Sequence, residues 1–274
     1  TRLVSSAASD VYKRQSSDLL KSLKELSFEA ANAIMRVYSQ EFISEEKKDG
    51  SPITQADLAS NKIIIEGLKL LTPTIPVVSE ETFNAADTYA SQYWLIDPLD
   101  GTKGFVNKDG NFAINIALIK MGEPIFGLVQ SPVLEKVWTS CDEKPNLTFT
   151  LQDKLRIVMS KNHQKEEDLS FLNHLEKKNI PFDLVQKGSS LKFTALCDDD
   201  ADLYPRFGPT SEWDIAAPHA VLNQYGGLTF SLENQKSLTY AKENILNPPF
   251  VAFKNELIYK EFGPIVEEFA KKLL

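Results

Sequence analysis

Apolar and polar positions along the chain follow two periods, one typical of helices and the other of strands. Apolar residues recur every three or four positions from Ser16 to about Phe42 and from Ser51 to Leu71, which predicts two long amphipathic helices. Short runs rich in β-branched and aromatic residues predict strands between the later helices. Further helices are predicted at 166–178, from 188 onward, at 215–225 and at 257–273. Strands are predicted at 75–79, 93–96, 112–120, 125–130, 137–139, 155–159, 182–186, 201–206, 228–230 and 249–253.

This mixture of helices and strands predicts a fold of the α/β (α+β) class. The polar segment 142–153 separates two such mixtures, so we expect an N-terminal domain over 16–153 and a C-terminal domain over 154–274. Residues 1–15 lack an initiator Met and any apolar periodicity, and we expect them to be a disordered or non-native leader. The charged segment 45–50 is expected to be a turn or a loop.

The composition of the 274 residues is that of an ordinary globular protein, with 42% hydrophobic and 25% charged residues. The formal net charge of −8 argues against a nucleic-acid polymer as partner, because such proteins usually carry a basic face. No run approaches the roughly 18 apolar residues of a transmembrane segment. Cys141 and Cys197 lack the spacing of a disulfide framework or a zinc site, so we expect a reducing cytoplasm. Oligomeric state and peripheral association with the inner membrane face are left open.

The stretch from Trp94 to Thr102, W-L-I-D-P-L-D-G-T, carries the most informative candidate chemistry. An apolar strand ends in Asp97 and Asp100, with Pro98 and Gly101 beside them to build a stiff turn that a ligand can approach closely. Carboxylates and a backbone carbonyl on such a turn are the ligands that Mg²⁺ prefers. A bare D-x-x-D is also common as an acidic surface turn, so the motif alone does not decide between the two interpretations.

A second separated motif removes much of this ambiguity. W-D-I-A-A at 213–217, followed by a Gly-Gly pair at 226–227, occurs together with T-x-x-D at 54–57 and S-E-E at 79–81. With the central stretch, these motifs resemble the inositol monophosphatase superfamily of Mg²⁺-dependent, lithium-sensitive phosphatases. The resemblance covers about residues 17–274. It implies a layered αβαβα sandwich of the inositol monophosphatase and fructose-1,6-bisphosphatase type.

The resemblance also implies roles for the acidic residues. Two or three Mg²⁺ ions would be held by Glu80, Asp97, the carbonyl of Leu99, Asp100 and Asp214. Asp57 and Thr102 would hold and deprotonate the attacking water, so that no covalent intermediate is needed. Without the resemblance, the preferred explanation of Asp57 is its place in the first turn of a helix, where the helix dipole favours a carboxylate. Glu80 would then be a surface residue.

Lys103, directly after the central motif, resembles the 3′(2′),5′-bisphosphate nucleotidase branch of the superfamily. In that branch, residues matching His163, Ser189, Lys192 and Arg206 contact the nucleotide and its second phosphate. Taken without the family, His163 and Lys192 would be solvated surface residues and Arg206 a charge at a strand end. The complete set expected to contact substrate is Glu80, Leu99, Asp100, Gly101, Thr102, Lys103, His163, Ser189, Lys192, Arg206 and Asp214.

The resemblance therefore implies a Mg²⁺-dependent phosphatase that converts 3′-phosphoadenosine 5′-phosphate to AMP and phosphate. The sulfated analogue is a second possible substrate, and the sequence does not rank the two. An inositol or sugar monophosphatase is an alternative that Lys103 and the segment around Arg206 disfavour. A metal- and nucleotide-binding sensor without catalysis is another alternative. The Asp57–Thr102 pair disfavours it, because binding alone does not need a base.

Overall fold

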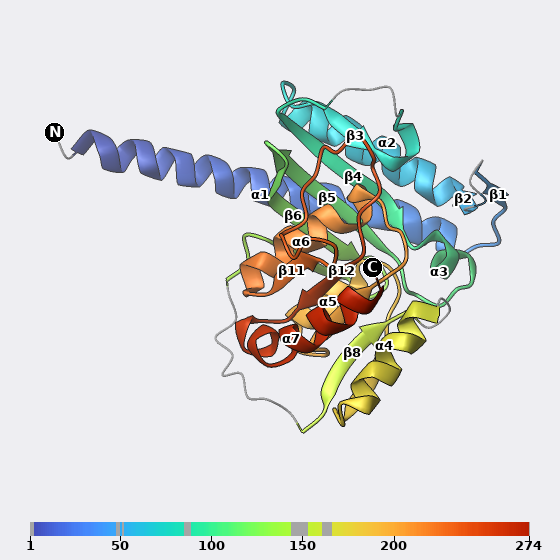
Figure 1. Ribbon diagram of the computed structural model, residues 1–274. Helices are drawn as coiled ribbons and strands as arrows, with labels where there is room; N and C mark the ends of the chain where they lie inside the picture. The colour runs from blue at the N-terminus through green and yellow to red at the C-terminus, as the bar shows by residue number, and fades with distance from the viewer. Residues whose placement is uncertain are drawn as a thin grey trace.

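The computed structural model describes residues 3–47, 50, 52–84, 89–143, 153–160 and 166–273, with the backbone alone for residues 3–16. In this part of the chain, helices and sheets alternate in five layers, as predicted (Figure 1). The outer layer on one side consists of α1 (Leu3–Tyr38) and α2 (Gln55–Leu71). The central layer consists of α5 (Leu191–Cys197) and α6 (Glu212–Tyr225). The opposite outer layer consists of α4 (Glu166–Lys177) and α7 (Glu256–Leu273).

Two five-stranded sheets, counted over the described residues, lie between these helical layers. The first sheet has the order β3-β4-β5-β6-β7, with β3 parallel to β4 and the other neighbours antiparallel. Its strands are β3 (Val77–Ser79), β4 (Gln92–Asp100), β5 (Ala113–Lys120), β6 (Glu123–Ser131) and β7 (Lys136–Thr139). The second sheet has the order β11-β12-β10-β8-β9. Its strands are β8 (Leu155–Met159), β9 (Phe182–Gln186), β10 (Leu203–Arg206), β11 (Leu228–Ser231) and β12 (Phe250–Phe253).

The strand β4 shows why the first sheet is buried on both faces. Tyr93 and Leu95 point into the core shared with the central helices, whereas Trp94 and Ile96 point into the core under α1 and α2. All four side chains are at most 1% exposed, as expected for a strand that is apolar at every position. The motif that follows Ile96 is therefore attached to a strand that is packed on both faces.

Several elements differ from the sequence prediction in their bounds, among them α1, α2 and α6. The helix α1 begins at Leu3 instead of Ser16, because the chain contains no Gly or Pro before Gly50 to stop a helix. The segment expected to be a turn begins as β1 (Ser44–Glu46), which pairs with β2 (Pro52–Thr54), so α2 begins at Gln55 instead of Ser51. The helix α6 begins at Glu212 instead of 215, so Pro218 lies inside the helix and not in its first turn.

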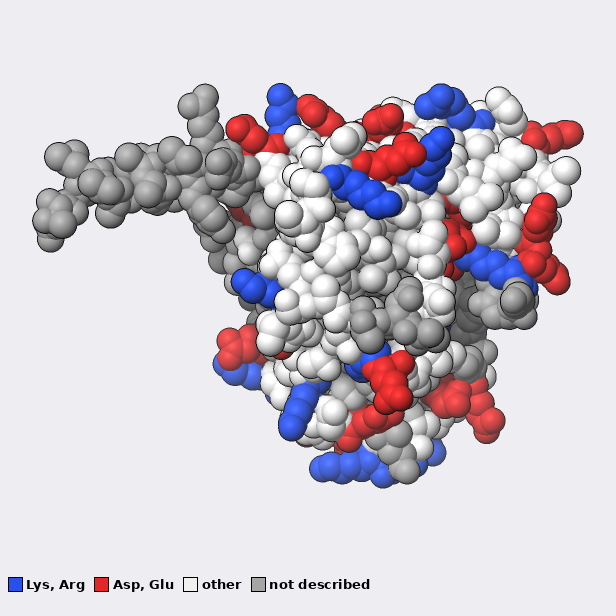
Figure 2. Space-filling view, turned by 90° about the horizontal axis from the view of Figure 1, so that it is seen from above, with Lys and Arg blue, Asp and Glu red and all other residues white. Residues whose placement is uncertain are grey.

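The two sheets come from consecutive parts of the chain, and their division into two domains near residue 153 stays a prediction. Within the described residues, no helix has the length and apolar content needed to cross a membrane. Viewed from above, basic and acidic side chains are interspersed over the surface (Figure 2).

Candidate active site

The end of β4 carries the two carboxylates of the central motif. β4 and β5 pair in register as far as Asp97, after which three residues of β4 span two of β5, forming a β-bulge. Pro98 lies inside this bulge, where its missing N–H leaves no gap in the ladder. Its carbonyl accepts a hydrogen bond from the Ser60 hydroxyl of α2 at 2.7 Å. The strand therefore does not end at Ile96, as the sequence suggested, but carries its irregularity through to Asp100.

Gly101 makes the turn from β4 into α3 (Thr102–Val106). Its φ of 91° lies in the left-handed region, which favours glycine. A Cβ at this position would lie 2.6 Å from the backbone oxygen of Asn111. Any side chain here would push the following segment away, so Gly101 is required for Thr102 to come back beside the end of β4.

The third carboxylate arrives from the second half of the chain on the helix α6. Ser211 and Asp214 form a capping box, in which the Asp214 Oδ2 accepts from the Ser211 backbone N–H at 2.8 Å. The carboxylate is thereby fixed at the first turn of α6. Asp97, Asp100 and Asp214 each offer one oxygen, and these three oxygens lie within 4.8 Å of one another.

Crowding of these carboxylates in a partly buried place disfavours their ionised forms. The pKa of Asp97 is raised well above its usual value by burial and by the neighbouring Glu80, Asp100 and Asp214. The pKa of Asp214 is raised to about 8 by burial and then by Asp100. The arrangement is thus unfavourable for the side chains alone, and it suits a group of high positive charge. An all-oxygen donor set of this kind fits a hard divalent cation.

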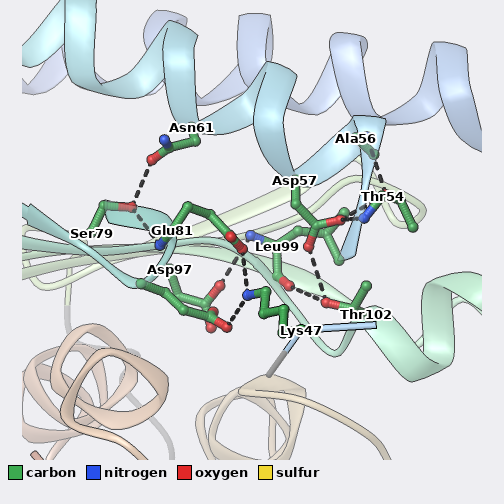
Figure 3. A network of polar contacts seen from close by, with 11 residues as sticks. Lys47, Thr54, Ala56, Asp57, Asn61, Ser79, Glu81, Asp97, Leu99 and Thr102 are labelled. Carbon is green, nitrogen blue, oxygen red and sulfur yellow. Dashed lines mark hydrogen bonds and ion pairs between the residues drawn. The ribbon is translucent and has the colours of Figure 1, made fainter. Parts of the chain in front are cut away.

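Asp57 lies beside this cluster, on the first turn of α2 (Figure 3). Its Oδ2 accepts from the backbone N–H and the hydroxyl of Thr54, at 2.8 Å and 2.6 Å. Its Oδ1 accepts from the Thr102 hydroxyl at 3.1 Å, and the same hydroxyl lies 3.2 Å from the Leu99 carbonyl. Burial raises the pKa of Asp57, although the hydrogen bonds from Thr54 and Thr102 act against this rise. Asp57 therefore serves as a helix cap and also reaches Thr102.

Glu80 has a partner that the sequence did not indicate. The Lys47 Nζ lies 2.7 Å from a carboxylate oxygen of Glu80 and 2.7 Å from one of Glu81. Lys47 follows β1, so the β1–β2 hairpin reaches across the end of β3 to these acids (Figure 3). Burial lowers the pKa of Lys47, but the two glutamates outweigh burial and raise it overall. The ammonium group is thus held as a cation next to the carboxylate cluster.

The second half of the chain contributes positive charge to the same site. Lys192, on α5, is 7% exposed, and its Nζ donates to the Ser189 carbonyl at 2.7 Å. Burial and the nearby Arg206 lower the pKa of Lys192 to about 8. Arg206 donates from Nη2 to the Pro209 carbonyl at 3.1 Å, while its buried Nε has no hydrogen-bond partner among the described residues. Two cations with spare donors, close enough to shift a pKa, form a site for an anion.

A cavity of about 300 Å³ joins the carboxylates to the two cations. The predicted site residues that line it are Glu80, Asp97, Leu99, Asp100, Gly101, Thr102, Lys103, Ser189, Lys192, Arg206 and Asp214. Asp57 does not line the cavity but contacts Thr102, which does. His163 lies outside the described residues. Residues from both sheets and from the central helices thus meet in one place.

Sequence analysis missed several residues of this site. No sequence pattern indicated that Lys47 belongs to the site, because its partners, Glu80 and Glu81, lie far along the chain. Asn115 could have been found, since a polar residue within an apolar strand is unusual. The structure shows that its side chain is fully buried. The capping box at the start of α6 was also visible in the sequence as S-x-x-D.

A layered αβαβα fold with clustered carboxylates at the end of a strand defines the class of this protein, and comparison with known proteins agrees. The chain belongs to the inositol monophosphatase family, whose model matches residues 15–267. The family is metal-dependent, which accords with the cluster of three aspartates.

Individual relatives narrow the comparison. The 3′(2′),5′-bisphosphate nucleotidase CysQ of Salmonella typhimurium is 39% identical over 246 residues, covering 85% of this chain and 98% of that protein. CysQ of Escherichia coli strain K12 is 37% identical, with the same coverage. The crystal structure of CysQ from Bacteroides thetaiotaomicron matches with a TM-score of 0.74 at 30% identity, covering 88% of this chain and 98% of that one. The inositol monophosphatase of Thermotoga maritima matches with a TM-score of 0.76 at 18% identity, over 94% of this chain and 100% of that one, and shows the fold alone.

Proposed function

We propose that this protein is a Mg²⁺-dependent 3′(2′),5′-bisphosphate nucleotidase. It removes the 3′-phosphate from 3′-phosphoadenosine 5′-phosphate, giving AMP and phosphate, and it accepts the sulfated analogue as a second substrate. The observation that carries the proposal is one cavity with a carboxylate cluster on one wall and two cations, the buried Lys192 and the partly buried Arg206, on the other. The names of the relatives from Salmonella typhimurium and Escherichia coli support it.

The first wall would hold two or three Mg²⁺ ions. The proposed ligands are Glu80, Asp97, the Leu99 carbonyl, Asp100 and Asp214. When bound, Mg²⁺ supplies the positive charge that activates water and offsets charge on the leaving oxygen. The bond from phosphorus to the ribose 3′ oxygen breaks as the bond from the water oxygen to phosphorus forms. One proton of the attacking water passes to Asp57, and the leaving 3′ oxygen takes up a proton from solvent.

Asp57 and Thr102 would position the attacking water and take up its proton. The Thr102 hydroxyl has one proton, which it donates either to Asp57 or to the Leu99 carbonyl. Donation to Asp57 leaves a lone pair of the Thr102 oxygen to accept from water, and it leaves the Leu99 carbonyl free for a cation. Since burial raises the pKa of Asp57, this carboxylate is a stronger base than an exposed aspartate.

The second wall would bind the 5′-phosphate, which does not react. Arg206 has an unpaired Nε beside a paired Nη2, so a phosphate can complete its hydrogen bonding. Lys192 adds a second charge at the same place. Lys103 and Gly101 line the cavity between the two walls, at the place proposed for the reacting phosphate. A contact from His163 stays part of the proposal without structural description.

A phosphate-release assay tests the proposed function. The bisphosphate nucleotide, inositol monophosphate and fructose bisphosphate are compared, each with Mg²⁺ and with a chelator. We expect the nucleotide to be hydrolysed with the highest kcat/KM and the chelator to abolish turnover. A preference for inositol monophosphate would replace the nucleotidase assignment. Binding of nucleotide and Mg²⁺ without phosphate release would identify a sensor.

The reducing cytoplasm is the expected location, in line with two free cysteines, Cys141 and Cys197.

A further inference from the structure

One oxygen of Asp100 is occupied by protein donors. The Asp100 Oδ2 accepts from the Ser189 hydroxyl at 2.7 Å, from the Ser190 backbone N–H at 2.6 Å and from the Asn115 side-chain amide at 3.3 Å. Ser189 and Ser190 precede α5 in the second half of the chain, whereas Asn115 belongs to β5. Donors from both halves therefore converge on one carboxylate oxygen of Asp100, a residue that lines the cavity, and the described residues donate no hydrogen bond to Oδ1.

The backbone at Ser189 is arranged for this contact. Its φ of 55° lies in the left-handed region, which is uncommon for a residue other than glycine. The preceding residue is held in place because the Gly188 N–H donates to the Asn111 side chain at 2.9 Å. This conformation aims a hydroxyl and the next backbone N–H at the same oxygen of Asp100. A non-glycine residue in this region marks a position that the surrounding structure constrains.

Asn115 links Asp100 to Asp214. Its amide nitrogen lies 3.3 Å from the Asp100 Oδ2 and 3.4 Å from the backbone carbonyl of Asp214. That carbonyl lacks its usual helical donor, because the residue four positions later is Pro218, which has no N–H. Both neighbours are acceptors, so the nitrogen and not the oxygen of the amide must face them. The buried Asn115 Oδ1 has no partner among the described residues, as expected of a side chain whose orientation is set by its amide nitrogen.

We propose that Asn115 and Ser189 are positioning residues of the metal site. By occupying Oδ2 of Asp100 they fix the carboxylate in one orientation and present Oδ1 to the cation. Asn115 also holds the start of α6, and with it Asp214, at a fixed distance from Asp100. This inference rests on the proposed function, because Asp100 and Asp214 are its proposed ligands. It assigns the Ser189 hydroxyl to the metal site and not to the nucleotide.

Two neighbouring serines offer a matched test. Ser189→Ala removes a side-chain donor to Asp100. Ser190→Ala keeps its donor to Asp100, because that donor is the backbone N–H. Among the described residues, the contact of the Ser190 hydroxyl is with the Ser189 hydroxyl, at 3.4 Å. Mg²⁺ affinity is measured by calorimetry without substrate. We expect Ser189→Ala to weaken it about 10–100-fold, the usual cost of removing a residue that orients a ligand. Ser190→Ala is expected to bind Mg²⁺ like the wild type.

Asn115→Leu provides an independent test on another element. Leucine has a similar size and removes the unpaired Oδ1 along with the donor, so the melting temperature without metal is expected to stay close to that of the wild type. Mg²⁺ affinity is expected to fall about tenfold or more. For both variants, kcat recovers at saturating Mg²⁺, and the KM for nucleotide is unchanged.

Two results would overturn the proposal. One is wild-type Mg²⁺ affinity in Ser189→Ala with a raised KM for nucleotide, which would make Ser189 a substrate contact. The other is wild-type Mg²⁺ affinity in a folded Asn115→Leu. If the substrate panel rejects the nucleotide while both variants still lose Mg²⁺, the proposed function fails and the positioning role stands. If the wild type itself binds no Mg²⁺, both proposals fail.

Discussion

The two walls of the cavity are built in different ways. Asp97 and Asp214 on the acidic wall, and Asp57 behind it, each accept a hydrogen bond from a backbone N–H within three residues. The donors are Leu99, Ser211 and Thr54 respectively. On the cationic wall, Arg206 keeps a donor without a partner among the described residues, and Lys192 donates to the Ser189 carbonyl and lies over the Tyr204 ring. Local hydrogen bonds thus fix the acidic groups before any ligand binds, whereas the cations can still donate hydrogen bonds to a ligand.

This difference separates the reaction from the choice of substrate. In the proposed mechanism every substrate would place its reacting phosphate against the acidic wall, so a change there should affect all substrates equally. Only a substrate that carries a second phosphate would contact the cationic wall. Substitutions in the acidic wall should therefore change the hydrolysis of all substrates, whereas substitutions in the cationic wall should change the hydrolysis of bisphosphates alone. The expected change is largest at Asp57 and smallest at Lys47.

The largest effect is expected on the acidic wall, for Asp57→Asn. The amide keeps the shape of the side chain but cannot accept a proton, and loss of a positioned base typically costs about 10²–10⁴-fold in rate. The rate constant kcat is measured for the bisphosphate and for adenosine 3′-monophosphate, with Mg²⁺ affinity as a control. Both kcat values should fall by the same factor, while Mg²⁺ binding is nearly unchanged. Near-normal turnover would remove Asp57 from the mechanism.

The next effect is expected on the cationic wall, for Arg206→Ala. Hydrogen bonds to charged groups contribute about 1.5–3 kcal/mol, so kcat/KM for the bisphosphate should fall by that equivalent. Adenosine 3′-monophosphate has no second phosphate and should hardly be affected. The measurement is the ratio of the two kcat/KM values in the wild type and the variant.

A matched control is Arg36→Ala, which removes the same charge from α1, where Arg36 donates to the Asn32 carbonyl. The ratio should keep its wild-type value in this variant. Equal losses on both nucleotides in Arg206→Ala would contradict the comparison of the two walls, because Arg206 would then support the fold or the reacting phosphate.

The different construction of the walls also explains what the sequence could predict. The carboxylates at positions 57, 97 and 214 are held by residues within the same motif, so motif and geometry coincide. The strand around Trp94 was predictable from its apolar pattern, since burial imposes a local period on the sequence. The layered order of elements was implied by the resemblance to the family and not by local periods. The exact start of α6 differs from the predicted residue 215, because the Ser211–Asp214 capping box already begins the helix at Glu212.

Contacts between distant segments could not be predicted in the same way. Lys47 meets Glu80 across 33 positions, and Ser189 meets Asp100 across 89. No local period or motif encodes such pairs, because they depend on how two sheets and a hairpin pack. The sequence indicated which groups carry the chemistry, and tertiary packing determines which groups hold them in place.

A smaller effect is expected from pH on the cationic wall. The pKa of Lys192 is lowered to about 8, chiefly by burial and then by Arg206, so its ammonium group loses its proton as the pH rises through that value. In the free enzyme, kcat/KM for the bisphosphate should fall from pH 7 to 9.5 by up to about tenfold relative to adenosine 3′-monophosphate. Using the ratio cancels pH effects at the acidic wall.

Lys192→Met is the control for this pH dependence. The variant should use the bisphosphate less well at pH 7, and the ratio of kcat/KM values should no longer change with pH. A pH-dependent ratio that persists in Lys192→Met would assign the titration to another group.

The smallest effect is expected at Lys47, whose positive charge is paired with two glutamates near the acidic wall. Its ammonium group pairs with Glu80 and Glu81 at 2.7 Å each, and Glu80 is a proposed metal ligand. A cation that binds Glu80 must compete with Lys47 for the carboxylate. Lys47→Met should therefore tighten Mg²⁺ binding about two- to fivefold, which corresponds to an ion pair of about 1 kcal/mol or less at a partly exposed site. The control Lys69→Met removes the same charge from an exposed position on α2 and should leave Mg²⁺ affinity unchanged. Weaker Mg²⁺ binding in Lys47→Met would show instead that Lys47 orients Glu80 for the ion, and the hairpin would then belong to the acidic wall.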